Sequence, residues 1–146
     1  MPAVLFDSTF YIAALRSREN WTQSLRRWSQ GAAVWLSAVV LEELYAGTTP
    51  RNRNVVAQMG QAYERTRRIV VPNLGDWTQV GIVLARLAAK YDFEDIGKGR
   101  LTNDALIAIS AGRVGCTIIT ANARDFARLS EFARFSWQVH DPRISD

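Results

Sequence analysis

Cysteine and histidine are scarce in this sequence, and their scarcity excludes several kinds of site. The chain of 146 residues has one cysteine, Cys116, and one histidine, His140. A single cysteine cannot form a disulfide framework within the chain, and its place inside the apolar run CTII predicts a small core residue. Cysteine-based metal sites are excluded, and a lone histidine argues against a histidine-based zinc site. Any metal is therefore expected to bind oxygen ligands.

Long apolar segments are also missing. The N-terminus MPAVLFDSTF has no basic leader with an extended apolar region and a cleavage site. No apolar run reaches the roughly 18 residues that a membrane span requires. We therefore expect no membrane association and a cytoplasmic location. A composition of 48% hydrophobic and 22% charged residues fits one compact domain over residues 1–146.

Lysine is nearly absent from a chain that is otherwise basic. Among 18 basic residues only Lys90 and Lys98 are lysines, and the formal net charge is +4. Arginine suits bidentate contact with phosphate, but a codon bias in the genome explains the ratio of arginine to lysine equally well. The positive charge itself is in the direction expected of a protein that meets a polyanion.

Short apolar runs rich in branched residues alternate with segments of helical periodicity. The predicted strands are PAVLF (2–6), AVWLS (33–37), RIVVP (68–72), CTIIT (116–120) and an edge strand FSWQV (135–139). The predicted helices cover 9–16, 20–29, 38–47, 51–68, 76–91 and a last segment within 101–115, with a loop at 92–100. Gly60 is expected to weaken the helix at 51–68, and Trp77 shares the apolar helical spacing of 76–91. Thr102 or Asn103 is the expected cap of the last helix. Short strands without a polar face are typical of parallel sheets covered on both sides, so the pattern predicts an open α/β fold.

Four acidic residues are predicted at one edge of this sheet. Asp7 ends the first strand, Asp125 follows CTIIT, Asp104 begins the helix before CTIIT, and Glu43 lies in the helix after AVWLS. Taken singly, each is better explained as a helix cap or a solvated side chain. Together they would repel one another unless a cation were present, and carboxylate oxygens favour Mg²⁺ or Mn²⁺.

The helix at 38–47 contains two adjacent glutamates that must be told apart. At about 100° per residue Glu43 falls beside Val40, Leu44 and Gly47, whereas Glu42 falls outside that arc. Glu43 is therefore the better candidate for a site facing the sheet.

A metal beside a basic surface suits hydrolysis of phosphodiester bonds, because the ion can activate water and stabilise the developing charge.

Four motifs in order along the chain resemble the PIN-domain ribonucleases, and most closely the VapC-type toxins of toxin–antitoxin pairs. The motifs are FDST after the first strand, E-L-x-x-G from Glu43, NDALIA at 103–108 and T-x-N-x-x-D-F at 120–126. The resemblance implies a three-layer fold with a mostly parallel sheet of about five strands. It also implies a ribonuclease dependent on Mg²⁺ or Mn²⁺, a homodimer, an RNA substrate and a cognate antitoxin.

By this resemblance Asp7, Glu43 and Asp104 are catalytic and metal-binding residues. Ser8, Thr9 and Thr120 fall where the family often has small hydroxyl residues that orient the site. Many members have an aspartate at the position of Asn122, and others have asparagine there and an acid three residues later. Asp125 therefore completes the catalytic and metal-binding set, reaching the ion directly or through water. Asn122 is expected to cap the helix that follows CTIIT and to organise the site by hydrogen bonding.

Three functions other than that of a ribonuclease toxin were weighed against the same residues: a non-catalytic protein of the same fold, a nuclease with another substrate and a signalling domain. A non-catalytic PIN-fold protein that binds RNA or regulates it would also carry an incomplete acidic site. A nuclease acting on DNA or structured RNA would share the metal chemistry. A phosphate-receiving signalling domain would need two adjacent acids early in the chain and a well-placed lysine late in it, and this chain has neither.

Overall fold

The sheet has the predicted parallel arrangement. The computed structural model describes residues 2–92 and 100–143, and in these residues five strands form one sheet in the order β3-β2-β1-β4-β5. Every neighbouring pair is parallel. The strands are β1 (Ala3–Phe6), β2 (Ala33–Ser37), β3 (Ile69–Val70), β4 (Cys116–Thr120) and β5 (Ser136–Val139). The predicted fold class is confirmed. Strand β3 is shorter than the apolar run RIVVP that predicted it.

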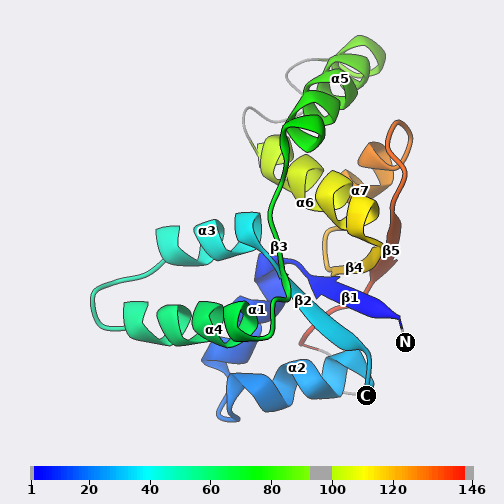
Figure 1. Cartoon of the computed structure of the whole chain (residues 1–146). Helices are drawn as coiled ribbons and strands as arrows, with labels where there is room; N and C mark the ends of the chain where they lie inside the picture. Colours follow the sequence, from blue (N-terminus) through cyan, green and yellow to red (C-terminus); the bar gives the residue numbers. More distant parts are fainter. Residues whose placement is uncertain (1, 93–99, 144–146) are drawn as a thin grey trace.

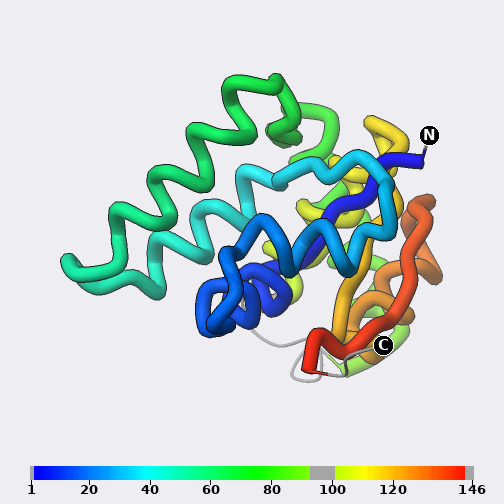
Figure 2. Tube along the Cα trace, turned by 90° about the horizontal axis from the view of Figure 1, so that it is seen from below, coloured from blue at the N-terminus to red at the C-terminus, as the bar shows by residue number. Residues whose placement is uncertain are grey.

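Seven described helices surround the sheet in two groups (Figure 1). They are α1 (Ser8–Arg16), α2 (Trp21–Ser29), α3 (Ala38–Ala46), α4 (Arg53–Arg65), α5 (Leu74–Lys90), α6 (Arg100–Val114) and α7 (Ala123–Leu129). Helices α5, α6 and α7 lie together on one side of the sheet, and α1 and α2 lie on the other. Helices α3 and α4 extend together beyond the sheet, as Figure 2 also shows. None of the described helices has both the length and the apolar character needed to cross a bilayer.

The core is built on the central strand and on aromatic contacts below it. Leu5 and Phe6 of β1 are fully buried. The Phe6 and Phe10 rings lie 5.1 Å apart, and Phe10 meets Trp28 edge to face at 5.4 Å. These contacts fix α1 and α2 on one face of the sheet, and therefore fix where Asp7, between β1 and α1, can lie.

A buried pair of tyrosines joins α1 to α4. The Tyr11 hydroxyl donates to the Tyr63 hydroxyl at 2.9 Å, and burial raises the pKa of Tyr63 to about 12. Gly60 was expected to weaken α4, but the helix continues through it. A Cβ at Gly60 would meet the side chain of Leu41 at 3.4 Å, so glycine allows α4 to pack closely on α3.

Two helix starts differ from the prediction. Helix α5 begins at Leu74 because Asn73 and Asp76 form a reciprocal capping box, each side chain accepting from the other's backbone N–H at 2.8 and 2.9 Å. Helix α6 begins at Arg100, so Thr102 and Asn103 lie inside it and the prediction that one of them caps it is wrong. Most of the predicted loop at 92–100 lies outside the described residues.

The register brings the ends of the two central strands together. Phe6 of β1 is aligned with Ile119 of β4, so Asp7, which follows β1, and Thr120, the last residue of β4, lie side by side at this edge. The backbone N–H of Asp7 still donates to the Ile119 carbonyl at 3.1 Å. Because all the strands are parallel, their carboxyl ends meet at one edge, where ligand sites of such sheets form.

Candidate acidic site at the carboxyl edge of the sheet

Asp7 lies at the centre of the predicted site. It is the N-cap of α1, and its Oδ1 accepts from the Thr9 backbone N–H at 3.1 Å. The Thr120 hydroxyl donates to its Oδ2 at 2.5 Å. The side chain is only 6% exposed, and this burial raises the pKa of Asp7, against the opposing effect of the hydrogen bonds from Thr120 and Thr9. Asp7 is thus a buried carboxylate whose two oxygens are both held.

Thr120 connects Asp7 to the loop after β4. Its side chain is fully buried, and its hydroxyl oxygen also accepts from the Asn122 backbone N–H at 2.9 Å. One hydroxyl therefore fixes a carboxylate that follows β1 and the turn that follows β4. The Thr120 hydroxyl thus contacts Asp7 directly. The side chain of Thr9 is exposed, and Thr9 contacts Asp7 through its backbone N–H.

Asn122 caps α7 and contacts two of the predicted acids. Its Oδ1 accepts from the Asp125 backbone N–H at 3.3 Å. Its Nδ2 donates to Asp125 Oδ2 at 2.9 Å and to Asp104 Oδ2 at 3.4 Å, the latter at the long end of the hydrogen-bond range. The helix cap predicted from the sequence is confirmed. The uncharged Asn122 side chain therefore hydrogen-bonds one acid from α6 and one from α7.

Glu43 approaches the site from α3. Its side chain is half-buried, whereas that of Glu42 is exposed, as the helical arc predicted. Burial raises the pKa of Glu43, a hydrogen bond from Asn103 lowers it, and the negative charges of Glu42 and Asp7 raise it again. A hydrogen bond from Ser8 lowers it further, and the net direction is upward. Glu43 therefore lies close enough to Asp7 for the negative charge of Asp7 to oppose the ionisation of Glu43.

Asn103 is a polar residue of this site that the sequence analysis missed. The sequence predicts only a helix cap at this position, but the structure places Asn103 where hydrogen bonding from its side chain lowers the pKa of Glu43. Its position next to Asp104 in the motif NDALIA was the available indication, because adjacent residues near a helix start can reach different neighbours across the same edge.

The site is a linked network and not an assembled metal-binding cluster. Within residues 2–92 and 100–143, no three His, Cys, Asp or Glu side chains are grouped so that they could hold a metal ion. The donor set nevertheless fits a hard cation, because its charged groups are carboxylates and a cation would relieve the repulsion between Asp7 and Glu43. The residues present fit Mg²⁺ or Mn²⁺ in their chemistry.

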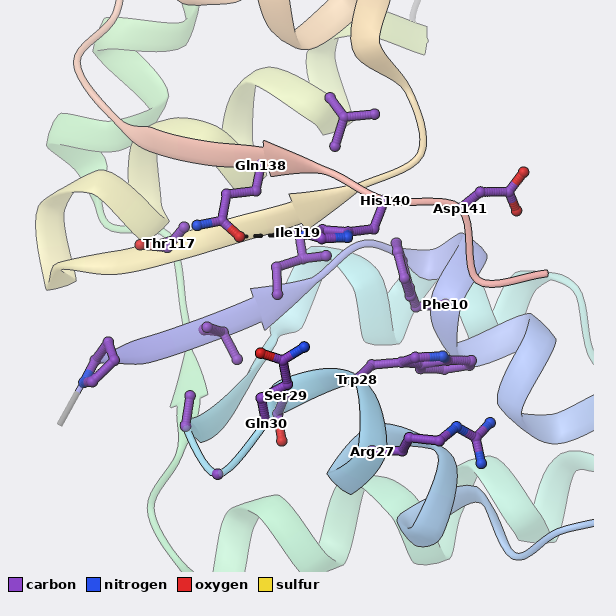
Figure 3. A pocket seen from close by; sticks show the side chains of 15 residues that line it. Phe10, Arg27, Trp28, Ser29, Gln30, Thr117, Ile119, Gln138, His140 and Asp141 are labelled. Atoms are coloured by element: carbon purple, nitrogen blue, oxygen red, sulfur yellow. Dashed lines mark hydrogen bonds between the residues drawn. The ribbon is translucent and has the colours of Figure 1, made fainter. Parts of the chain in front are cut away.

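Two grooves border α1, which contributes Phe10 to the first and Ile12 to the second. The first, with a volume of about 690 Å³, runs between the end of α2 and β5 (Figure 3). Within it Trp28 lies between Phe10 and Arg27, whose guanidinium carbon is 5.9 Å from the Trp28 ring centre. The second groove, of about 700 Å³, includes Thr9 and Ala121 and so reaches the margin of the acidic site. Neither groove is lined by the four predicted acids.

Comparison with known proteins identifies the family. The model of the PIN domain family matches residues 4–131. The chain belongs to the PIN domain family. The recognition of that family from four short motifs is therefore confirmed. No curated protein matched the chain.

Several solved structures share the fold of this chain. A chain of VapBC2 from Rickettsia felis bound to a DNA fragment from its promoter is 16% identical, with 95% of this chain and 99% of that chain covered and a TM-score of 0.61. A chain of DNA-bound VapBC from Salmonella typhimurium is 18% identical, with 95% and 98% covered and a TM-score of 0.61. A chain of FitAcB from Neisseria gonorrhoeae is 21% identical, with 95% and 97% covered and a TM-score of 0.59. At these identities the likeness shows a shared fold.

Proposed function

We propose that this PIN domain is a metal-dependent endoribonuclease that hydrolyses RNA phosphodiester bonds, and that it is the toxin of a type II toxin–antitoxin pair. The observation that supports this most is the hydrogen-bonded path from Asp7 through Thr120 and Asn122 to Asp104 and Asp125. It joins acids far apart in sequence at the edge of the sheet where ligand sites form.

Asp7, Glu43, Asp104 and Asp125 are the residues that would hold Mg²⁺ or Mn²⁺. A bound ion would supply an activated water and would stabilise the charge that develops on the phosphate. The chain's own polar groups would keep the carboxylates in place. Thr120 holds Asp7, as the distance of 2.5 Å indicates. Hydrogen bonding from Asn103 and Ser8 favours the charged form of Glu43.

The surface around α4 supplies positive charge for an RNA backbone. Its exposed arginines are Arg51, Arg53, Arg65, Arg67 and Arg68. Phosphate contacts of this kind give affinity that falls with salt and carries little sequence preference. We propose that this helix contributes to RNA or partner contact, and that charge reversal at Arg51 and Arg53 weakens salt-dependent RNA binding.

The proposed partners are an antitoxin and a second copy of the chain, in the cytoplasm. The support for an antitoxin is that solved structures with this fold include VapBC and FitAB. Copurification with the product of a small open reading frame next to this gene would test it. A neighbouring product that forms no complex would contradict this part of the proposal.

The enzymatic proposal is tested with two adjacent glutamates as a matched pair. Glu43→Gln is expected to abolish Mg²⁺-dependent cleavage of RNA, because it removes a proposed ligand. Glu42→Gln removes the same charge from an exposed neighbour and is expected to retain cleavage. Thermal melting with Mg²⁺ or Mn²⁺ supplies a second readout, because an ion that binds only the folded state raises the melting temperature. Equal cleavage by both variants, or no metal-dependent shift in the wild type, would sink the assignment.

A non-catalytic RNA-binding protein on the same fold is the second candidate. It is favoured by the absence of an assembled three-acid group among the described residues and by the uncharged Asn122. RNA binding without cleavage in the presence of either metal would support it over the nuclease.

A further inference from the structure

The groove between the end of α2 and β5 presents a tryptophan ring (Figure 3). Trp28 is fixed by two buried neighbours, since its ring meets Phe10 edge to face at 5.4 Å and Phe6 at 6.2 Å. Both phenylalanines are fully buried, whereas Trp28 is partly exposed and lines the groove. A tryptophan held in this way is a rigid platform on which a flat ring can stack.

Hydrogen-bonding side chains lie around this platform. Gln30 follows α2, and Gln138 and His140 lie at the end of β5; all three are exposed and line the groove. Figure 3 shows Gln138 and His140 on the β5 side of the groove and Trp28 on the α2 side. The Gln138 Oε1 and His140 Nε2 atoms are 3.4 Å apart, at the long end of the hydrogen-bond range. Amide and imidazole groups can donate to and accept from the edge of a heterocyclic base.

Gln30 has a side chain where the backbone favours glycine. It is the C-cap of α2, and its φ of 51° lies in the left-handed region. Glycine adopts this conformation without the steric cost that a side chain adds. The Gln30 side chain makes no hydrogen bond with the described residues of the chain. A strained residue whose side chain has no partner in the described chain is a candidate for contact with a ligand.

This groove is continuous with the one that reaches the acidic site. The two grooves share Val139, His140 and Asp141 as lining residues. The second groove also includes Thr9, whose backbone N–H donates to Asp7 at 3.1 Å. A chain lying in both grooves would therefore connect the acidic site with the Trp28 platform.

Arginines line this path. Arg27 lines the first groove, and Arg16 and Arg143 line the second. Asp141 is the one acid among the described residues that line either groove, and Arg143 contacts it at 2.8 and 3.0 Å. Arg27 pairs with Glu19 at 2.6 Å, but both side chains are about half exposed, and such pairs contribute little. An aromatic platform beside positive charge is the surface that binds single-stranded nucleic acid.

We propose that the two grooves hold the RNA on one side of the cleaved bond, with one unpaired base stacked on Trp28 and its phosphate at Arg27. This rests on the proposed ribonuclease activity and gives it a subsite for base recognition. The first groove, at about 690 Å³, lies within the roughly 300–1,000 Å³ of ligand pockets and has room for a nucleotide. Gln30 and Gln138 would contact the base edge and so influence which sequence is cut. Duplex RNA would be excluded, because its bases are already stacked.

Binding of short, fluorescein-labelled homopolymers of adenylate, cytidylate and uridylate by the full chain in EDTA tests the platform without cleavage. The wild type is expected to bind at least one of them. Trp28→Leu is expected to weaken binding at least about fivefold, the lower limit for loss of a base stacked on an aromatic side chain. Trp28→Phe keeps a ring and is expected to retain most of the affinity. Trp77→Leu is the control, because Trp77 is also half exposed but lies on α5, away from both grooves.

Two adjacent arginines give a matched pair that leaves the aromatic core untouched. Arg26 and Arg27 are both exposed on α2, and only Arg27 lines the groove. Arg27→Gln is expected to weaken binding and to reduce the salt dependence by about 0.7 in the slope of log K against log salt. Arg26→Gln is expected to leave both unchanged. Gln30→Gly is expected to weaken binding without lowering the melting temperature, because glycine accepts the left-handed backbone.

Cross-linking locates the base relative to the cleaved bond. RNA carrying 4-thiouridine at successive positions is irradiated with the protein in EDTA. Cross-links to the peptide that contains Trp28 are expected from one or two adjacent positions on one side of the mapped cleavage site. Cross-links from every position alike, or none, would overturn the proposal.

The failure of this subsite and the failure of the nuclease proposal give different results. A wild type that cleaves RNA while Trp28→Leu and Arg27→Gln bind it like their controls would overturn the subsite alone. A wild type that binds RNA through these residues and never cleaves it would overturn the nuclease alone and support the grooves as an RNA surface. Variants that lose binding of the antitoxin and keep binding of RNA would assign the grooves to a protein and overturn the proposal.

Discussion

Thr120→Val removes the hydroxyl that joins Asp7 to the β4 turn while nearly preserving shape. Two hydrogen bonds are lost, one of 2.5 Å to Asp7 Oδ2 and one of 2.9 Å from the Asn122 N–H. A hydrogen bond to a charged group contributes about 1.5–3 kcal/mol and a neutral one about 1 kcal/mol. Because the first hydrogen bond is buried and the second is partly buried, we expect Thr120→Val to lower the free energy of unfolding at neutral pH by about 3 kcal/mol. This corresponds to a melting temperature lower by roughly 10 °C.

The pH dependence of this loss separates a charge-assisted bond from simple packing. The Thr120 hydrogen bond lowers the pKa of Asp7, which burial holds above its ordinary value of 3.8. Without the bond, the pKa of folded Asp7 rises further above its unfolded value. The folded variant then binds more protons than the unfolded chain between those two values, so its stability falls as pH rises through that window. The cost of Thr120→Val is therefore expected to be larger at neutral pH than below 3.8.

Urea unfolding of metal-free protein at both pH values measures this difference. Thr120→Ser is the control, because it keeps the hydroxyl and removes only a methyl group. It is expected to retain most of the pH dependence of the wild type. If Thr120→Val costs the same at both pH values, or less than about 0.5 kcal/mol, the argument that this hydroxyl holds a carboxylate would be refuted.

Three further predictions concern stability without metal. The wild type should become less stable as pH rises from 3.8 toward the raised pKa of Asp7. At neutral pH the variant Asp7→Asn should therefore be more stable than the wild type, as measured by thermal melting in EDTA. A lower melting temperature for Asp7→Asn would contradict this. Arg113→Met removes the arginine that pairs with Asp76 at 3.0 Å, and the Asp76 side chain is only 4% exposed. The free energy of unfolding, measured in urea, is expected to fall by about 1–3 kcal/mol, a range that allows for screening of the half-exposed Arg113 by solvent. Gly112→Ala would place a Cβ 2.5 Å from the Arg134 carbonyl oxygen, so a loss of about 1–3 kcal/mol is expected by the same method. Unchanged midpoints would refute either of the last two.

The strands and most helices could be predicted because their patterns are local. The runs AVWLS and CTIIT coincide with β2 and β4, since short segments without a polar face have few alternatives to a covered strand. The separation of Glu43 from Glu42 also followed from helical geometry alone. Asn122 as a cap followed from its position after a strand and before a periodic segment.

Contacts between distant elements could not be predicted in the same way. That Asn103 meets Glu43 depends on how α6 packs beside α3, which no local pattern encodes. The start of α6 was misplaced because Thr102 and Asn103 are good caps in isolation, and the chain uses them inside the helix. Trp77 shares the helical spacing of the apolar residues of α5, but it is 54% exposed. Periodicity alone does not distinguish the two sides of a helix that is apolar on both.

The most direct test of the central claim is cleavage of total RNA by the purified chain, with the new ends mapped. The account predicts discrete ends with Mg²⁺ or Mn²⁺, none in EDTA, recovery when the metal is restored, and none with Asp104→Asn under any condition. Cleavage that persists in EDTA, or in Asp104→Asn at the wild-type rate, would contradict a metal-dependent site built on these acids.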